Sequence, residues 1–161
     1  KKIGMGYGMD FKDKQIIRQL QKNGKISNIE LAENVNLSPS PCLRRVKILE
    51  QKGIITGYTA EIDQKLYGLP LTVFARVRLE RHDLETVKNF EKHILNCNEV
   101  IECHLMSGSS DYQLKILTSD LDTYEKFVRN NLHTIGGIAS IDTSVAYGTI
   151  KKKIIFPFNK I

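Results

Sequence analysis

The spacing of apolar residues changes once along this chain, after Gly57, and the change requires two folding units of different kinds. Before Gly57, apolar residues recur every three to four positions, which is the period of helices that bury one face. From Leu71 to Leu79 they alternate with polar residues, which is the period of a strand with one buried face. The sequence therefore predicts a helical unit followed by an α+β unit.

Start and stop signals divide the first part into three short helices. Ser27 and Glu30 form a capping box, because each side chain can accept a hydrogen bond from the other residue's amide. Proline after serine marks another start, because its missing N–H costs nothing in a first turn. The expected boundaries are Asp10 as the first cap, Asn23-Gly24 as a left-handed stop, Ser27 as the second cap, a stop near Asn36, Ser38-Pro39 as the third start and Lys52-Gly53 as the last stop.

The second and third predicted helices are separated only by residues 36–38, which is typical of a helix-turn-helix. In that motif the later helix enters the major groove of duplex DNA. A helical wheel places Leu43 and Val46 toward the core. Arg44 and Arg45 then face outward, where arginine can bond guanine edges or phosphates. The predicted DNA-binding residues are Ser38, Ser40, Pro41, Arg44, Arg45, Lys47 and Lys52.

The distribution of charge supports a polyanionic partner for the helical part. The chain has 24 Lys and Arg against 18 Asp and Glu, and the whole excess of +6 falls within residues 1–59. The alternative is a solvated arginine pair that neighbouring acids, Glu30 or Glu50, neutralise. Because the motif spacing, the capping box and the charge agree, we favour double-stranded DNA as the partner.

The second part predicts a ferredoxin-like βαββαβ unit, an antiparallel sheet with both helices on one face. The expected elements are strands 71–79, 100–107, 112–118 and 141–147, helices 84–95 and 121–132, and further strands at 58–62 and 150–156. The expected organisation is a flexible tail (1–9), a helix-turn-helix domain (10–57), a strand and hinge linker (58–70) and the ferredoxin-like domain (71–161).

Several classes of protein are disfavoured. No run approaches the roughly 18 apolar residues of a membrane span, and the N-terminus lacks a signal-peptide core, so we expect a soluble, cytoplasmic protein. The three cysteines have no metal-binding or disulfide spacing, and no Cys or Ser stands at motif spacing from a His. We therefore expect no metal, no cofactor and no enzymatic activity.

A polar turn at Ser107–Asp111 has the chemistry to bind a free amino acid. Gly108 permits close backbone approach and the serines can donate to a carboxylate, while Asp111 can accept from an ammonium. The alternative interpretation is that these residues satisfy a hairpin turn and nothing more.

Five blocks of sequence, residues 26–32, 37–50, 53–58, 102–108 and 111–112, closely resemble the Lrp/AsnC family of transcription regulators, and Ser109-Ser110 between the last two departs from it. The resemblance runs from about Asp10 to Lys152. It implies a regulator that binds pseudo-palindromic DNA, with a C-terminal domain that pairs protomers, assembles dimers into an octamer and binds an amino acid between dimers. The effector-binding residues so implied are Leu105, Met106, Ser107, Gly108, Ser109, Ser110 and Asp111, with Ile135, Gly136, Thr143 and Val145 contributed across an interface.

Two rival functions remain open at this point. Ferredoxin-like sheets also sense amino acids in enzymes or regulatory subunits of amino-acid metabolism that do not bind DNA. An RNA-binding or purely structural module is the other, although its sheet would offer only scattered aromatics such as Phe74 for base stacking.

Overall fold

The computed structural model describes residues 8–157 and divides the chain into two compact units. The first unit comprises residues up to Glu61 together with the C-terminal segment from Lys151, and the second comprises Ile62–Ile150. This division differs from the expected one at the C-terminus, since the expected second domain ran to the end of the chain. Residues 1–7 of the predicted tail lie outside the described residues.

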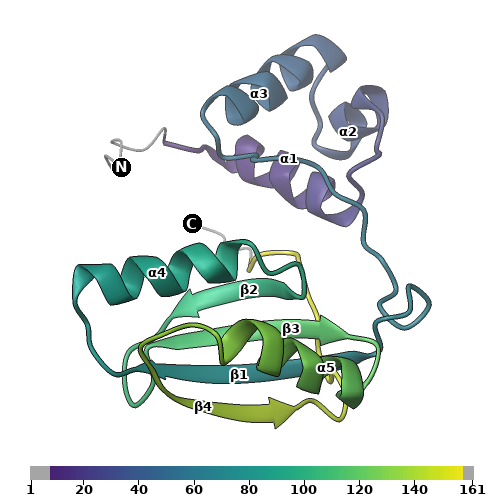
Figure 1. The fold of residues 1–161 in the computed structure, drawn as a ribbon. Coiled ribbons are helices and arrows are strands. Elements are labelled where there is room, and N and C mark those ends of the chain that lie inside the picture. The colour runs from purple at the N-terminus through teal and green to yellow at the C-terminus, as the bar shows by residue number, and fades with distance from the viewer. Residues whose placement is uncertain (1–7, 158–161) are drawn as a thin grey trace. The chain divides into compact units, whose positions relative to one another are not determined.

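The first unit is built on three helices, α1 (Phe11–Lys22), α2 (Asn28–Asn34) and α3 (Pro39–Gln51), as predicted (Figure 1). Both α1 and α2 begin with a complete capping box, formed by Asp10 with Asp13 and by Ser27 with Glu30. Proline occupies the first turn of α3. Local chemistry therefore sets all three helix starts.

One turn and one strand differ from the expectation. Asn36 (φ 52°) and Gly53 (φ 68°) are left-handed after α2 and α3, but the left-handed stop predicted at Asn23-Gly24 is wrong, because Asn23 is extended. The strand predicted over residues 58–62 is wrong, because that segment has no ladder partner. It is anchored instead by a side chain, since the Tyr58 hydroxyl donates to Glu50 Oε1 at 2.9 Å.

The core of the first unit also corrects the helical wheel of α3. Leu43, expected inside, is 43% exposed, whereas Cys42 and Leu49 are fully buried. Leu43 and Cys42 are neighbours in sequence and therefore 100° apart around the helix axis. The buried face of α3 is thus rotated by one residue from the predicted one. The buried cluster consists of Ile16, Leu31, Ala32, Val35, Cys42 and Leu49.

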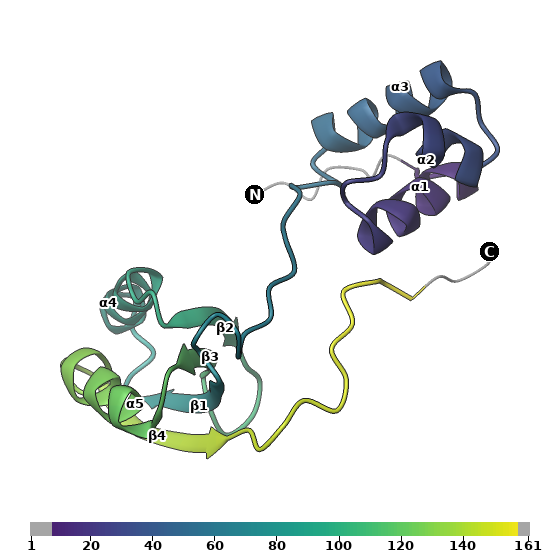
Figure 2. The same cartoon turned by 90° about the vertical axis from the view of Figure 1, so that its right-hand side faces the viewer.

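The second unit has the predicted βαββαβ order and is an antiparallel sheet of four strands in the order β2-β3-β1-β4. Its elements are β1 (Leu71–Leu79), α4 (Leu84–Leu95), β2 (Val100–Leu105), β3 (Tyr112–Thr118), α5 (Leu121–Phe127), the π-helix η1 (Val128–Leu132) and β4 (Ile138–Val145). Both helices lie on the same side of the sheet (Figure 2). The α+β fold class is thus confirmed.

Alternation in β1 and β3 places one face of the sheet against the helices. Val73, Ala75 and Val77 are fully buried and pack with Phe90 of α4. The opposite face carries paired charges, Arg76 with Asp142 at 2.7 Å and Lys115 with Glu102 at 2.7 Å. The strand predicted over residues 150–156 is wrong, because β4 ends at Val145 and the later residues join no sheet.

Candidate functional site

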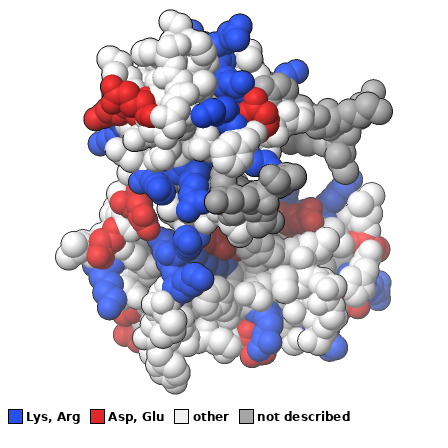
Figure 3. Space-filling model, turned by 180° about the vertical axis from the view of Figure 1, so that it is seen from behind, with Lys and Arg blue, Asp and Glu red and all other residues white. Residues whose placement is uncertain are grey.

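One face of α3 is open and cationic. Six residues at helical spacing border a shallow hollow of about 360 Å³ on it: Ser40, Leu43, Arg44, Lys47, Ile48 and Gln51. Arg44 and Lys47 are exposed, and neither forms an ion pair with another of the described residues. A band of Lys and Arg side chains crosses the first unit, at the top of the view in Figure 3. This face can meet an anionic surface without breaking an internal contact.

The amino end of α3 adds donors to the same surface. The Ser38 hydroxyl makes no capping bond to its own helix, so it is available together with the hydroxyl and the amide of Ser40. Pro41 and Lys52 are also exposed, at the start and just beyond the end of the helix. Pro39 and Pro41 carry no N–H, so the Ser40 amide, the two serine hydroxyls and the helix dipole are what can attract an anion such as phosphate at this end.

Arg45 does not face outward, and this corrects the expected arginine pair. Its Nη1 donates to Asp10 Oδ2 at 2.7 Å and to Asp13 Oδ1 at 2.8 Å, and Asp13 is 1% exposed. Hydrogen bonds to these two carboxylates raise the pKa of the Arg45 guanidinium. The Asp13 amide and the Arg45 guanidinium lower the pKa of Asp10. Arg45 therefore ties α3 to the start of α1.

The predicted DNA-binding residues omit three residues of the α3 face, Leu43, Ile48 and Gln51. A signal for all three was present, because Cys42, Val46 and Leu49 recur at helical spacing and define the buried stripe. Taking Leu43 in place of Cys42 as the core residue rotated the predicted buried face of the helix by one position. Free cysteine is among the most frequently buried residue types.

The turn between β2 and β3 is a closed hairpin whose loop faces solvent. Met106 N donates to the Asp111 carbonyl at 2.8 Å, and Gly108 is left-handed at φ 117°. Ser107 and Ser109 are exposed, and Leu105 and Met106 are 77% and 39% exposed. Hydroxyls, backbone and apolar surface thus lie together on this turn.

Asp111 was expected to bind a ligand ammonium, but both of its carboxylate oxygens already have partners. Oδ2 accepts from the Leu79 amide at 2.7 Å and Oδ1 contacts His82 Nε2 at 2.8 Å. The Leu79 amide, and secondarily His82, lower the pKa of Asp111. The geometry makes Asp111 a brace that fixes the turn to the end of β1.

The other expected effector residues are only partly brought together. Ile135 is 3% exposed and belongs to the core, so its side chain is not a contact for a ligand. Gly136 is exposed and lies near the turn. Its neighbour Gly137 accepts a hydrogen bond from Glu80 N, and Glu80 directly follows Leu79, whose amide bonds Asp111. Thr143 and Val145 lie toward the other end of β4, where they pair in register with Ala75 and Val73.

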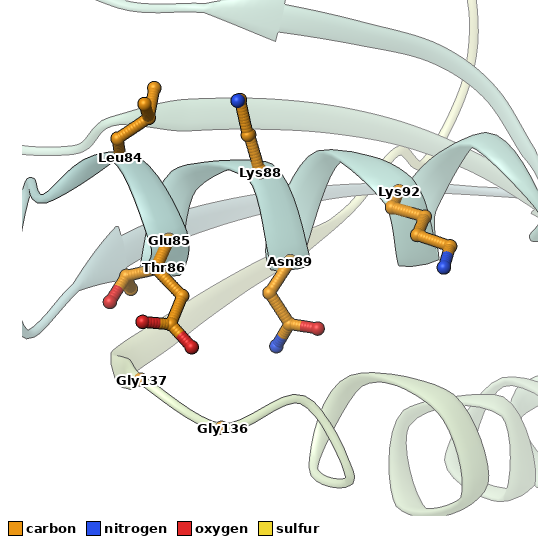
Figure 4. A pocket seen from close by; sticks show the side chains of 8 residues that line it. All are labelled: Leu84, Glu85, Thr86, Lys88, Asn89, Lys92, Gly136 and Gly137. Atoms are coloured by element: carbon orange, nitrogen blue, oxygen red, sulfur yellow. The ribbon is translucent and has the colours of Figure 1, made fainter.

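A groove of about 720 Å³ lies between α4 and the loop that precedes β4 (Figure 4). Glu85, Thr86 and Asn89 point from the helix toward Gly136 and Gly137 in that view. Gly137 is required here, because a Cβ on it would lie 2.7 Å from Thr86 Cγ2. The groove was not foreseen, since nothing in the sequence pairs α4 with that loop.

None of the helices between residues 8 and 157 is long and apolar enough to cross a membrane. Within the same range, His, Cys, Asp and Glu side chains form no group of three or more that could hold a metal ion.

Two family models match the chain, one for each unit. Residues 9–56 match a winged helix-turn-helix DNA-binding model. Residues 72–155 match the Lrp/AsnC ligand binding domain. Together they cover most of the chain in the order that the structure gives.

Relatives with names extend over nearly the whole length. The chain is 36% identical over 157 residues to the transcriptional regulator AzlB of Bacillus subtilis, covering 98% of this chain and 100% of the relative. It is 40% identical over 144 residues to a leucine-responsive regulatory protein of Haemophilus influenzae, covering 89% and 87%. A transcriptional regulator of Neisseria meningitidis, solved as a complex with L-Met, has 34% identity and a TM-score of 0.89, with 94% and 97% covered.

Proposed function

This chain belongs to the Lrp/AsnC family of DNA-binding transcription regulators, which are not enzymes, and from that premise we propose that it reads an operator through α3 and responds to an amino acid. Family membership removes the enzyme alternative. The further parts of the proposal concern which residues read DNA, where the effector binds and how copies of the chain assemble.

We assign base reading to the open face of α3, and this face is the observation that carries the proposal. Arg44 can bond a guanine edge with two donors, and Gln51 can do the same with adenine. Leu43 offers an apolar contact for a thymine methyl group. Lys47 and Lys52 are assigned to phosphates, because a flexible ammonium carries little geometric information.

The test begins with duplexes selected by the protein from a random pool, followed by affinity measurements on the selected site. Arg44→Ala should weaken binding by about 10- to 100-fold and relax specificity at one base pair. Lys47→Ala should weaken all duplexes alike and lower the salt slope by about 0.9. No enrichment of any sequence, or an unchanged affinity in both variants, would contradict the assignment.

The effector site that we propose is the turn from Leu105 to Ser110. Its exposed hydroxyls and the Gly108 backbone would hold the carboxylate of an amino acid, and Leu105 and Met106 would contact its side chain. Asp111 keeps the turn in place without contacting the ligand. The Neisseria relative, crystallised with L-Met, supports an amino acid as the class of ligand.

A screen of the twenty amino acids by thermal shift tests the effector, since a ligand of the native state raises apparent stability by mass action. Ser109→Ala with Ser110→Ala should weaken binding of the amino acid found in the screen by about 100-fold or more, as expected for two lost hydrogen bonds to a charged group. Lys92→Ala in the groove of Figure 4 is the matched control. A loss in the control alone would move the site from the turn to the groove.

The proposed working form is a homo-oligomer, a dimer that assembles further into an octamer in the cytoplasm. Paired reading heads suit a two-fold symmetric operator. Exposed apolar side chains on the edge strand β2 and beside it, Ile101, Leu105 and Met106, favour burial by a second copy. Thr143 and Val145 are proposed contributions across such an interface. Sedimentation would show one mass for the dimer and a larger one, and a monomer at all concentrations would refute this.

The effector would act by favouring one assembly over another. Its effect on DNA binding cannot exceed its differential affinity for the two assemblies. Sedimentation with and without the amino acid measures this directly, and an effector that changes DNA affinity without changing assembly would contradict the mechanism.

A further inference from the structure

The C-terminal segment (residues 151–157) belongs to the DNA-binding unit, although the ligand-domain match extends to residue 155. The Gln21 side chain of α1 fixes it at two points. Its Nε2 donates to the Ile154 carbonyl at 3.1 Å, and its Oε1 accepts from the Phe156 amide at 3.2 Å. One amide side chain therefore bonds this backbone as a neighbouring strand would.

Side-chain contacts complete the attachment. Phe156 and Pro157 line a small hollow of about 240 Å³ together with Met9, Ile17 and Gln21. Lys152 lies 3.9 Å from Glu61, which is in the same unit. Residues 154–157 are thus held on α1, and Lys152 is paired with a residue of the irregular stretch that follows α3.

This placement changes the charge of the DNA-binding unit. Its described residues up to Glu61 hold nine Lys and Arg against six Asp and Glu, a net charge of +3. The lysine triplet, Lys151–Lys153, doubles this to +6, and all three lysines are exposed. The second unit, Ile62–Ile150, has nine basic and twelve acidic residues, a net charge of −3. An exposed triplet on the cationic unit increases the attraction for a polyanion.

We propose that the lysine triplet is a second DNA contact, which the C-terminal segment holds on the reading unit to bind backbone phosphates. The proposal rests on the proposed function. Lysines of this kind add affinity without sequence information, because every duplex presents the same phosphates.

The test measures DNA affinity by fluorescence anisotropy, with a labelled duplex selected by the protein, across 50–200 mM salt (about the range over which counterion release is usually read). The variant carries Lys151→Gln, Lys152→Gln and Lys153→Gln in the full chain. Each lost phosphate contact lowers the slope of log K against log salt by about 0.9, so three lower it by about 2.7. Over a fourfold change in salt, the parent should lose about 40-fold more affinity than the variant.

A matched variant removes the same charge from the other unit, through Lys65→Gln, Lys88→Gln and Lys92→Gln. These lysines are exposed and form no ion pair with another of the described residues. Its slope should stay within about 0.5 of the parent value. If the two triple variants bind alike, the triplet contributes only net charge and the proposal is overturned.

A second pair of variants tests the attachment without changing charge. Gln21→Ala removes both hydrogen bonds to the segment and should lower the slope toward that of the lysine variant, whereas Gln19→Ala on the same helix should not. An unchanged slope in Gln21→Ala would refute the role of the docked segment. A parent that binds no duplex refutes the proposed function itself, whereas a parent weakened by Arg44→Ala but not by the lysine changes refutes this inference alone.

Discussion

Adjacent arginines of α3 should respond in opposite ways to truncation, and the difference can be worked out from their partners. Arg45 bridges Asp13, which is 1% exposed, and Asp10, whose side chain is 51% exposed. Removing one partner of a fully buried pair costs about 3–5 kcal/mol. The Arg45 side chain is 29% exposed, so we discount the Asp13 contact to about 2–3 kcal/mol for solvent screening. The exposed Asp10 contact adds at most about 1 kcal/mol.

Arg45→Ala should therefore lower the free energy of unfolding of the first unit by about 2–4 kcal/mol. For a unit of this size, such a loss lowers the melting temperature by roughly 10–30 °C. Arg44→Ala, at an exposed position, should change stability by less than about 0.5 kcal/mol. Circular dichroism follows the helical first unit through its thermal transition in both variants.

A double variant separates an unpaired buried charge from lost packing. Adding Asp13→Ala to Arg45→Ala removes the stranded carboxylate, so the pair should be less destabilising than the sum of the single changes. If Arg45→Ala has the same melting temperature as the parent, or if the destabilisations of the two single variants simply add in the double variant, then Arg45 does not stabilise the packing of α3 against α1.

Three further predictions concern single positions. Gly137→Ala should destabilise the second unit by about 1–3 kcal/mol, because φ is 87° and the new Cβ meets Thr86. Gly136→Ala is the control and should not destabilise it, because a Cβ there meets nothing within 4 Å. Equal melting temperatures of the two variants would contradict this. Hydrogen bonds from Ser27 lower the pKa of Glu30. The ionised Glu30 carboxylate therefore stabilises the folded state above the ordinary pKa of 4.5, and this contribution is lost as pH falls below it. Glu30→Gln should then flatten the acid side of the pH profile of unfolding, and an unchanged profile would argue against it. Burial and Glu50 raise the pKa of Tyr58 to about 12, so the contribution of the protonated hydroxyl to folding stability is lost as pH rises from 10 to 12. The difference in absorbance between the parent and Tyr58→Phe should therefore titrate near 12 instead of 10.

The helix starts and the order of the second unit could be predicted because their causes are local. A capping box joins residues three apart, and a proline start acts within one turn. Alternation in β1 depends only on which side chains face the core. The same reasoning failed for the strands at 58–62 and 150–156, because a strand exists only through a partner elsewhere in the chain.

Side-chain roles at the candidate site were less predictable for the same reason. Arg44 and Arg45 are indistinguishable in sequence, yet packing of α3 against α1 brings two carboxylates from more than thirty residues away to one of them. Asp111 likewise accepts from an amide of β1, a partner that the sequence did not indicate. Long-range partners decide which polar groups remain available to a ligand.

By itself the sequence determined the two periods, the caps, the turn residues and the family, all of which follow from spacing or composition along the chain. The tertiary structure alone decided that Leu43 is outside and Cys42 inside, that Arg45 serves the fold, and that Lys151–Lys153 join the cationic unit. The physical reason is that hydrogen bonds, ion pairs and burial depend on distance in space, and only folding brings residues such as Gln21 and Phe156 within reach of each other.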